Sequence, residues 1–338
     1  MITRAISDLL EKKNLSDDVA QGAMDEIMEG KATPAQIAGF LVGLRMKGET
    51  VNEIVSLAKI LRSKAKIVYP KADHLVDTCG TGGDRSGTFN ISTTAALVAA
   101  GAGAHVAKHG NRSVSSQSGS ADVLEALGVR ISIEPNRARE CIEKAGMGFL
   151  FAPNHHPSMK HAAPVRKELG VRTVFNLLGP LSNPANAPAQ VLGTYSEELV
   201  EVFAKALKDL GTTRALVVHC NGLDEIGLHA KTSVCELHNG NITRYQLDPA
   251  DFGMDYAPIE SLKGGNAQEN AQITKEILAG KTGPRRDAVL LNAAAALVVC
   301  GVAKDMKEGI QKAEDSIDSG KANAVLTKMI AFTNEGSQ

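Results

Sequence analysis

The sequence predicts an α/β fold in which a large domain, with a mainly parallel sheet flanked by helices, is joined to a small all-helical domain. Residues 75–219 alternate short apolar runs with helical segments, a pattern typical of a parallel sheet. Residues 1–70 contain helical patterns only. The chain has 338 residues, whereas single cores stop growing at about 250–300 residues. We therefore expect a small domain at residues 1–70 and a large domain at 71–338.

Helical spacing of apolar residues indicates three helices in the small domain. The first carries Ile2 and Ile6 on one face. The second is expected to start at Thr33 and Pro34, because Thr is a favoured N-cap and Pro is favoured at the first helical position. The third is expected to begin near Thr50.

Beyond residue 70, apolar runs predict strands and the segments between them predict helices. The expected strands are 75–78, 104–107, 129–133, 148–152, 190–194 and 214–219. The expected helices are 92–101, 120–127, 136–145, 196–210, 269–279, an Ala-rich buried helix at 287–303 and a polar helix at 305–319. Residues 229–248 are more typical of antiparallel strands with a turn at Asn239-Gly240-Asn241. The His- and Pro-rich segment 154–185 is expected to be helical and to pack back on the N-terminal helices, which would make the small domain discontinuous.

Composition and charge argue against several classes of function. The 37 basic and 38 acidic residues give a net charge of −1, so neither nucleic acid nor a membrane is an expected partner. The five cysteines are odd in number and lack CxxC spacing, which disfavours a disulfide framework or a zinc site. The longest apolar stretch, 290–303, is shorter than the roughly 20 residues of a membrane span. Because the N-terminus also lacks a signal-peptide pattern, we expect a cytoplasmic protein.

A glycine-rich loop follows the first predicted strand and reads Asp77-Thr78-Cys79-Gly80-Thr81-Gly82-Gly83-Asp84. Its three glycines allow backbone N–H groups to approach an anion closely. A helix then begins around Asn90-Ile91-Ser92, and helix N-termini favour phosphate. The loop is neither a Walker A nor a dinucleotide-binding turn. It predicts an anion site, with a plain strand-to-helix turn as the alternative, while Cys79 is more typical of a small buried hydrophobe than of a nucleophile.

A second polar loop follows the strand expected at 104–107 and reads Lys108-His109-Gly110-Asn111-Arg112-Ser113-Val114-Ser115-Ser116. It leads to a helix for which Ser120 is the expected N-cap. Lys108 and Arg112 supply positive charge and the serines supply hydroxyl donors, a suitable lining for a pyrophosphate. A solvated loop is the alternative. Because α/β sheets bind ligands at the carboxyl ends of their strands, the two loops together predict an anion site.

Two further features are ambiguous by themselves. Asp224 and Glu225 are adjacent carboxylates in a glycine-containing loop after a predicted strand, which suits Mg²⁺ beside phosphate oxygens; adjacent acids are also common on surfaces. Arg166, in the segment 163–170, has a guanidinium suited to a bidentate grip on a carboxylate. From spacing alone, a solvated surface helix is the better explanation of Arg166.

Several motifs together resemble those of the anthranilate phosphoribosyltransferase family in order and spacing. They are GTGGD, NIST, KHGNR with SGSAD, the block HHPSMKHAAPVRKELGVRTVFNLLGPLSNP and the GLDE loop. The resemblance covers nearly the whole chain and implies a nucleoside phosphorylase/phosphoribosyltransferase-like fold and a homodimer. It also implies the third step of tryptophan biosynthesis, in which anthranilate and phosphoribosyl pyrophosphate give N-(5-phosphoribosyl)anthranilate and pyrophosphate, with one or two Mg²⁺ ions.

The resemblance further implies roles for individual residues. The expected contacts to phosphoribosyl pyrophosphate are Gly80, Gly83, Asp84, Thr88, Asn90, Ile91, Ser92, Thr93, Lys108, His109, Gly110, Asn111, Arg112, Ser113, Val114, Ser115, Ser116 and Ser120. The expected anthranilate contacts are Gly80, Asn111 and Arg166, with His109 and the Gly179-Pro180 turn nearby. The expected magnesium ligands are Ser92, Asp224 and Glu225, and the expected catalytic residues are Lys108, His109 and Asn111.

The implied reaction must stabilise a departing pyrophosphate, which Mg²⁺, Lys108 and loop N–H groups can do. An aromatic amine is neutral at pH 7, so we expect positioning and electrostatics rather than a covalent nucleophile, with His109 a candidate to accept the amine proton late. Two rivals are a pyrimidine-nucleoside phosphorylase and a non-enzymatic paralogue that binds nucleic acid. The KHGNR and APVRKELG blocks argue against the first, and the charge balance and complete motifs argue against the second.

Overall fold

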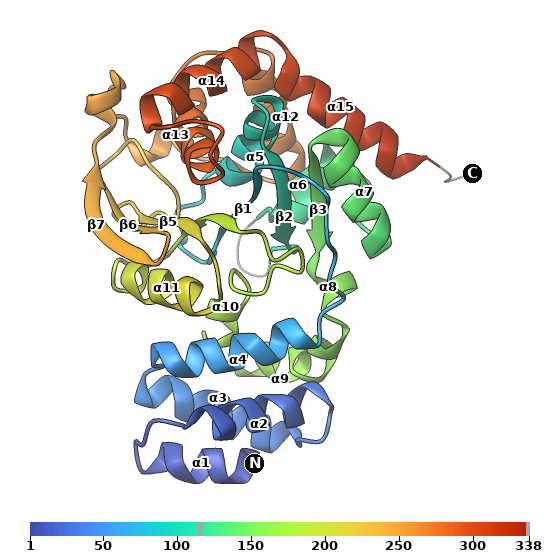
Figure 1. Ribbon diagram of the computed structural model, residues 1–338, viewed down its shortest axis with the longest axis vertical. Helices are drawn as coiled ribbons and strands as arrows, with labels where there is room; N and C mark the ends of the chain where they lie inside the picture. The colour runs from blue at the N-terminus through green and yellow to red at the C-terminus, as the bar shows by residue number, and fades with distance from the viewer. Residues whose placement is uncertain (114–116, 336–338) are drawn as a thin grey trace.

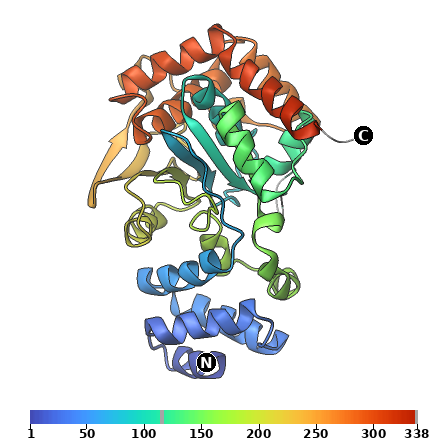
Figure 2. The same ribbon diagram turned by 45° about the vertical axis from the view of Figure 1, so that its right-hand side comes forward.

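The computed structural model of the chain describes residues 1–113 and 117–335 and consists of a helical bundle beneath an α/β unit (Figure 1). The bundle contains α1 (Ile2–Leu10), α2 (Asp17–Met28), α3 (Pro34–Lys47) and α4 (Val51–Ser63). Turning the molecule, as in Figure 2, keeps the bundle at one end and the C-terminal helices at the other. Within the described ranges, none of the helices combines the length and apolar character of a membrane span.

Two bundle helices start where the sequence predicts, and capping explains why. The Thr33 side chain accepts from the Gln36 N–H while the Gln36 side chain accepts from the Thr33 N–H, with Pro34 at the first helical position. Thr50 and Glu53 form the same reciprocal arrangement at the start of α4. Each box satisfies N–H groups that a helix N-terminus otherwise leaves without partners. Helix α2, by contrast, is absent from the sequence prediction.

The α/β unit is built on a seven-stranded sheet with the order β3-β2-β1-β4-β5-β6-β7. Its strands are β1 (Leu75–Gly80), β2 (His105–Gly110), β3 (Met147–Phe151), β4 (Ala189–Gly193), β5 (Arg214–His219), β6 (Thr232–His238) and β7 (Asn241–Leu247). The first five pair in parallel and the last three antiparallel. His238 pairs with Asn241 across the Asn239-Gly240 turn, where both turn residues have positive φ. The expected mainly parallel sheet is confirmed.

Helices cover both faces of the sheet. On one face lie α5 (Ile91–Gly101) and α13 (Pro284–Val299), backed by α12 (Ala267–Leu278), α14 (Met306–Asp318) and α15 (Lys321–Asn334). On the other face α11 (Glu198–Asp209) packs against β5 and β6. The remaining helices of this unit are α6 (Ser120–Ala126) and α7 (Pro135–Ala145), with short 3₁₀ turns η2 (Pro249–Phe252) and η3 (Ile259–Leu262). Helix α15 is absent from the sequence prediction.

The strand expected at 129–133 is wrong. These residues belong to neither a helix nor a strand. Val129 and Ile131 are buried in the core while Arg130 and Ser132 are exposed, so the alternation of apolar residues is real. The Arg130 N–H donates to Thr333 Oγ1 of α15, and β3 instead takes the place beside β2. Alternation alone therefore does not distinguish a strand from an extended segment packed on helices.

The segment 152–178 returns to the bundle. It forms α8 (Ala152–His155), η1 (Pro157–His161), α9 (Ala163–Leu169) and α10 (Phe175–Leu178), and α9 contacts α3 while α10 contacts α4. A single hydrophobic cluster runs from the interior of α1–α4 through Phe175 and Leu178 to α11 and to Leu192 and Val217 of the sheet. The bundle and one face of the sheet thus share one core.

Candidate active site

Three loops converge at the carboxyl ends of the strands. This end of the sheet faces the bundle. The acidic loop after β5 crosses β4 and reaches the glycine loop after β1, where the Gly82 N–H donates to Asp224 Oδ2 over 2.7 Å. The Ser92 N–H at the start of α5 donates to Glu225 Oε1 over 3.0 Å. The sequence-predicted glycine and acidic motifs are therefore brought together by direct hydrogen bonds.

Two strand-terminal glycines make this crossing possible. A Cβ at Gly193, the last residue of β4, would lie 1.5 Å from the Asp224 backbone oxygen, and one at Gly80 would lie 2.5 Å from Asp224 Oδ2. At Gly193 the obstacle is backbone, so only glycine fits there, whereas at Gly80 the nearest atom is the end of the Asp224 side chain, which a Cβ would push aside. The glycines let the acidic loop lie directly on the ends of β1 and β4.

The acidic loop concentrates negative charge in a partly buried place. Burial raises the pKa of Glu225 to about 7, while the neighbouring Lys108 opposes this shift. Burial, with the charges of Asp84 and Glu225, raises the pKa of Asp224 well above its ordinary value. Asp84 Oδ2 is buried and has no hydrogen-bond partner among the described residues. Such crowded carboxylates favour a cation between them.

The side chains around the acidic loop are suited to binding Mg²⁺. Asp84, Asp224 and Glu225 offer hard carboxylate oxygens, and the Ser92 hydroxyl lies beside Lys108 Nζ, 3.4 Å away. In the described ranges no three His, Cys, Asp or Glu side chains form a ready-made metal cluster. Mg²⁺ commonly uses one or two carboxylates together with water and substrate phosphate oxygens, so a partial protein ligand set suffices.

Lys108 lies inside the protein beneath the loops. Its side chain is 2% exposed, and its Nζ donates to the Thr78 carbonyl and lies 3.4 Å from the Thr78 and Ser92 hydroxyls. Burial lowers the pKa of the Lys108 amine, and the charges of Asp77 and Glu225 act against that shift. The ammonium therefore places positive charge between β1 and the start of α5.

His109 faces a second histidine. The His109 and His156 rings lie 5.1 Å apart, and His109 Nε2 and both His156 ring nitrogens are buried without hydrogen-bond partners among the described residues. Burial lowers the pKa of His109 well below its ordinary value, and burial lowers that of His156 to about 4. Both rings are therefore neutral at pH 7, and each retains a nitrogen available to a polar ligand.

The second loop has its first residues close to α6. Arg112 forms ion pairs with Asp122 at 3.0 Å and with Glu125 at 2.7 Å, so its guanidinium is engaged by these acids. The N-cap of α6 is Gly119, not Ser120, because the Asp122 side chain accepts from the Gly119 N–H. The Ser120 hydroxyl instead donates to the Asn111 carbonyl. Val114, Ser115 and Ser116 lie outside the described residues.

Some of the remaining predicted phosphate contacts lie around the N-terminus of α5, and the others lie near α6 and at the end of β2. Asn90, its N-cap, is held by Ser118 and by the Asn270 side chain, and Thr88 forms a β-bridge with Lys263. Ile91 and Thr93 are buried. Ser113 is half-buried, and its N–H donates to Asp122. Gly110 ends β2, where a Cβ would lie 2.3 Å from Ser120 Oγ.

Arg166 lies on α9, apart from the loops. Its guanidinium is 5.1 Å from the centre of the Phe175 ring, and burial lowers its pKa. No hydrogen bond or ion pair joins this guanidinium to another side chain in residues 1–113 and 117–335. A half-buried cation without an anion beside it is suited to binding an anionic ligand.

Sequence reasoning missed several residues that shape the site. Asp77 lies in the quoted glycine motif, but its role emerges only from the fold: it accepts from the His109 N–H and from Gln190 Nε2. Gln190 Nε2 also donates to the Pro180 carbonyl. Arg172 contacts Gly83 and Tyr195. Most of these partners lie far apart along the chain, so no local pattern could have indicated them.

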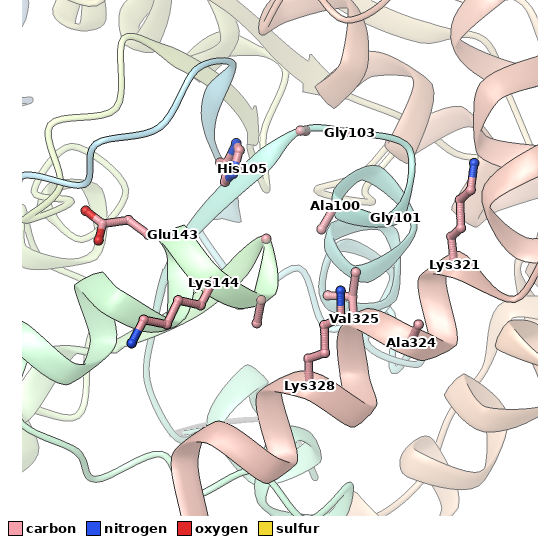
Figure 3. Close-up of a pocket in the computed structure, with 13 residues that line it drawn as sticks. Ala100, Gly101, Gly103, His105, Glu143, Lys144, Lys321, Ala324, Val325 and Lys328 are labelled. Atoms are coloured by element: carbon pink, nitrogen blue, oxygen red, sulfur yellow. The ribbon is translucent and has the colours of Figure 1, made fainter.

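A different hollow lies at the other end of the sheet. Figure 3 shows it between α5, the start of β2, α7 and α15, with His105, Lys321 and Lys328 among its lining residues. His105 is the first residue of β2, so this hollow opens at the amino ends of the strands. It contains none of the residues discussed above.

Comparison with known proteins identifies the family. The helical bundle domain of the glycosyl transferase family matches residues 3–65, and its a/b domain matches residues 72–323. The chain is 55% identical over 335 residues to the anthranilate phosphoribosyltransferase of Acetivibrio thermocellus, covering 99% of this chain and 97% of that protein.

Solved structures give the same result. The anthranilate phosphoribosyltransferase of Thermus thermophilus has a TM-score of 0.93 and 46% identity, covering 98% of this chain and 99% of that one. The enzyme of Saccharomyces cerevisiae in complex with PRPP and Mg has a TM-score of 0.90 and 31% identity, covering 98% of both chains. Sequence and fold agree, and the chain belongs to the anthranilate phosphoribosyltransferase family.

Proposed function

We propose that this chain transfers the phosphoribosyl group of phosphoribosyl pyrophosphate to the amine of anthranilate, giving N-(5-phosphoribosyl)anthranilate and pyrophosphate in tryptophan biosynthesis. The observation that carries this proposal is the convergence of the glycine loop, Lys108 and the Asp224-Glu225 pair at one sheet edge. Amide donors, a buried cation and a carboxylate pair at one point are what a sugar pyrophosphate with a divalent metal requires.

In this proposal the pyrophosphate lies against the glycine loop and the N-terminus of α5. The expected contacts are those that the family resemblance implies, from Gly80 to Ser120. Backbone N–H groups and the helix dipole stabilise the negative charge that grows on the leaving group. Asp224, Glu225 and Ser92, with Asp84 close by, would hold Mg²⁺, which would supply further charge neutralisation. The proposal includes one or two bound Mg²⁺ ions.

Anthranilate lies on the bundle side of the site. Arg166 is proposed to bind its carboxylate, with Gly80 and Asn111 as further contacts and His109 beside the ring. The neutral state of His109 allows a ring nitrogen to accept the amine proton after attack, because burial depresses its pKa. The protein thereby aligns the amine with the ribose carbon, and positioning rather than a covalent intermediate accounts for the rate.

Three further properties complete the proposal. We propose a homodimer, a small helical domain at 1–70 joined by part of 154–185, and a large domain at 71–338. A cytoplasmic location is supported by five cysteines that are all free, as is usual in a reducing compartment. No nucleic-acid or membrane partner is proposed, in keeping with the net charge of −1.

The direct test follows the loss of anthranilate fluorescence when phosphoribosyl pyrophosphate and Mg²⁺ are added. We expect consumption that needs both additions and that weakens in Asp224→Asn and Glu225→Gln, which keep the shape of each side chain but remove its charge. Turnover of a pyrimidine nucleoside with phosphate, in the absence of anthranilate consumption, would favour the phosphorylase rival. Activity that is independent of Mg²⁺ would contradict the proposal that the acidic pair binds a metal needed for the reaction.

A further inference from the structure

The peptide bond between Gly83 and Asp84 is held in place by a residue outside the glycine loop. Gly82 and Gly83 both have positive φ, at 66° and 72°, so the chain turns sharply here. The Gly83 carbonyl accepts a hydrogen bond from Arg172 Nη2. Arg172 comes from the connection between α9 and α10, 89 positions further along the chain, and therefore fixes the loop from the bundle side.

The orientation of this peptide decides what the loop presents to an anion. In a trans peptide the C=O and the N–H point in opposite directions, and the described chain contains no cis bond. With its carbonyl turned to Arg172, the peptide directs the Asp84 N–H away from Arg172. That N–H, like the Gly83 N–H, has no hydrogen-bond acceptor among residues 1–113 and 117–335. A reversed peptide would instead direct a carbonyl oxygen at the anion.

The guanidinium of Arg172 is itself fixed by Tyr195. It lies 4.1 Å from the centre of the Tyr195 ring, and stacking of this kind orients a planar guanidinium. Tyr195 is also tied to the same loop, because its backbone N–H donates to Thr81 Oγ1 over 3.0 Å. Tyr195 and Arg172 therefore hold the loop at two points, Thr81 and Gly83.

We propose that Arg172, oriented by Tyr195, is a positioning residue that keeps the Gly83–Asp84 peptide turned with its N–H available to the pyrophosphate. This inference rests on the proposed function and adds to it a residue outside the anion loop. Glycine at position 83 gives the backbone the freedom to turn either way, so the orientation requires an external partner. Arg172 therefore affects the binding of pyrophosphate and leaves the binding of anthranilate unchanged.

The test measures binding of magnesium pyrophosphate by calorimetry, and KM for each substrate, in five single variants and in the double variant Arg172→Ala/Tyr195→Leu. In Arg172→Ala we expect pyrophosphate affinity to fall and KM for phosphoribosyl pyrophosphate to rise, each roughly tenfold, as for the loss of one charge-assisted hydrogen bond. KM for anthranilate should change less than about twofold. Arg172→Lys should restore part of the affinity, since an ammonium can still donate to the Gly83 carbonyl.

Variants of Tyr195 distinguish whether Arg172 orients the peptide or contacts the pyrophosphate directly. Tyr195→Leu keeps the charge of Arg172 but removes the stacking surface, so it should weaken pyrophosphate binding in the same direction, and less than additively with Arg172→Ala. Tyr195→Phe keeps the ring and should match the wild type. Lys167→Ala removes an exposed cation from the same segment and serves as the control for charge.

Three results would overturn the proposal. The first is wild-type pyrophosphate affinity in a folded Arg172→Ala, judged by circular dichroism. The second is wild-type affinity in Tyr195→Leu together with weak binding in Arg172→Ala, which would mean that Arg172 contacts the ligand itself. The third is a wild-type protein that neither binds magnesium pyrophosphate nor consumes anthranilate, which would reject the proposed function as well.

Discussion

At the scale of single residues, the two cations of the proposed site differ in how they are neutralised. Lys108 is buried among Thr78, Ser92 and nearby carboxylates, so its charge is balanced by the protein. Arg166 has an aromatic neighbour, Phe175, but no anionic partner in the described residues. The cation that lacks a partner is the one available to a substrate carboxylate, which supports the proposal, first implied by the family resemblance, that Arg166 binds anthranilate.

Replacing Arg166 by Ala is expected to raise KM for anthranilate. A charged hydrogen bond contributes about 1.5–3 kcal/mol, which corresponds to a change of roughly tenfold or more. Steady-state kinetics with each substrate varied in turn measures the effect, and Lys167→Ala on the same helix is the matched control. A rise in KM for phosphoribosyl pyrophosphate instead would show that Arg166 serves the other substrate.

At the scale of elements, the site depends on loops that lie directly on strand ends. The acidic loop rests on β4 because Gly193 has no side chain, and it is tied to the loop after β1 and to the start of α5. The relative positions of the carboxylates, the glycine loop and the helix N-terminus therefore depend on one close backbone contact between β4 and the acidic loop.

Gly193→Ala should displace the acidic loop. The added Cβ would meet backbone atoms that cannot rotate away, so we expect a stability loss of about 1–3 kcal/mol and weaker stabilisation of the protein by Mg²⁺. Urea unfolding with and without Mg²⁺ measures both effects. Gly39→Ala is the control, since its Cβ would meet only Ile6, with Cδ1 at an ordinary 3.6 Å. A Gly193→Ala protein with unchanged response to Mg²⁺ would contradict the role given to this contact.

The sequence predicts elements well where start signals or short apolar runs are present, as at Thr33, Thr50 and the parallel strands. It fails where the deciding partner is distant. Residues 129–133 have the alternation of a strand, but their neighbour is α15 rather than another strand. The anion loops are recognisable from their own residues, whereas Arg172 and Gln190 enter the site only because strands and the segment 152–178 bring them there.

At the scale of the whole molecule, the most exposed large apolar side chains lie on the bundle. Met46 at the end of α3 is 83% exposed and Leu10 at the end of α1 is 79% exposed, and α1 packs against α3. Apolar side chains of this size are usually covered when an assembly forms. This surface is therefore where we expect the second chain of the proposed homodimer.

Met46→Glu is expected to weaken the dimer, because a charge would be placed in an apolar contact. Sedimentation equilibrium should give twice the chain mass of 35.6 kDa for the wild type and a lower average mass for Met46→Glu. Tyr256→Glu, at a half-exposed position of the α/β unit, should sediment as the wild type does. A wild type that sediments as a single chain at micromolar concentration would count against the homodimer.

The core shared by α1–α4, Phe175, α11 and the sheet has a consequence for how the chain loses its structure. The bundle and this face of the sheet contribute to one continuous hydrophobic cluster, so melting one exposes apolar surface of the other to water. We therefore expect the two architectural parts to unfold in one cooperative step on heating. A fragment ending near residue 70 would lack much of the surface on which its helices close and would not be an autonomous folding unit.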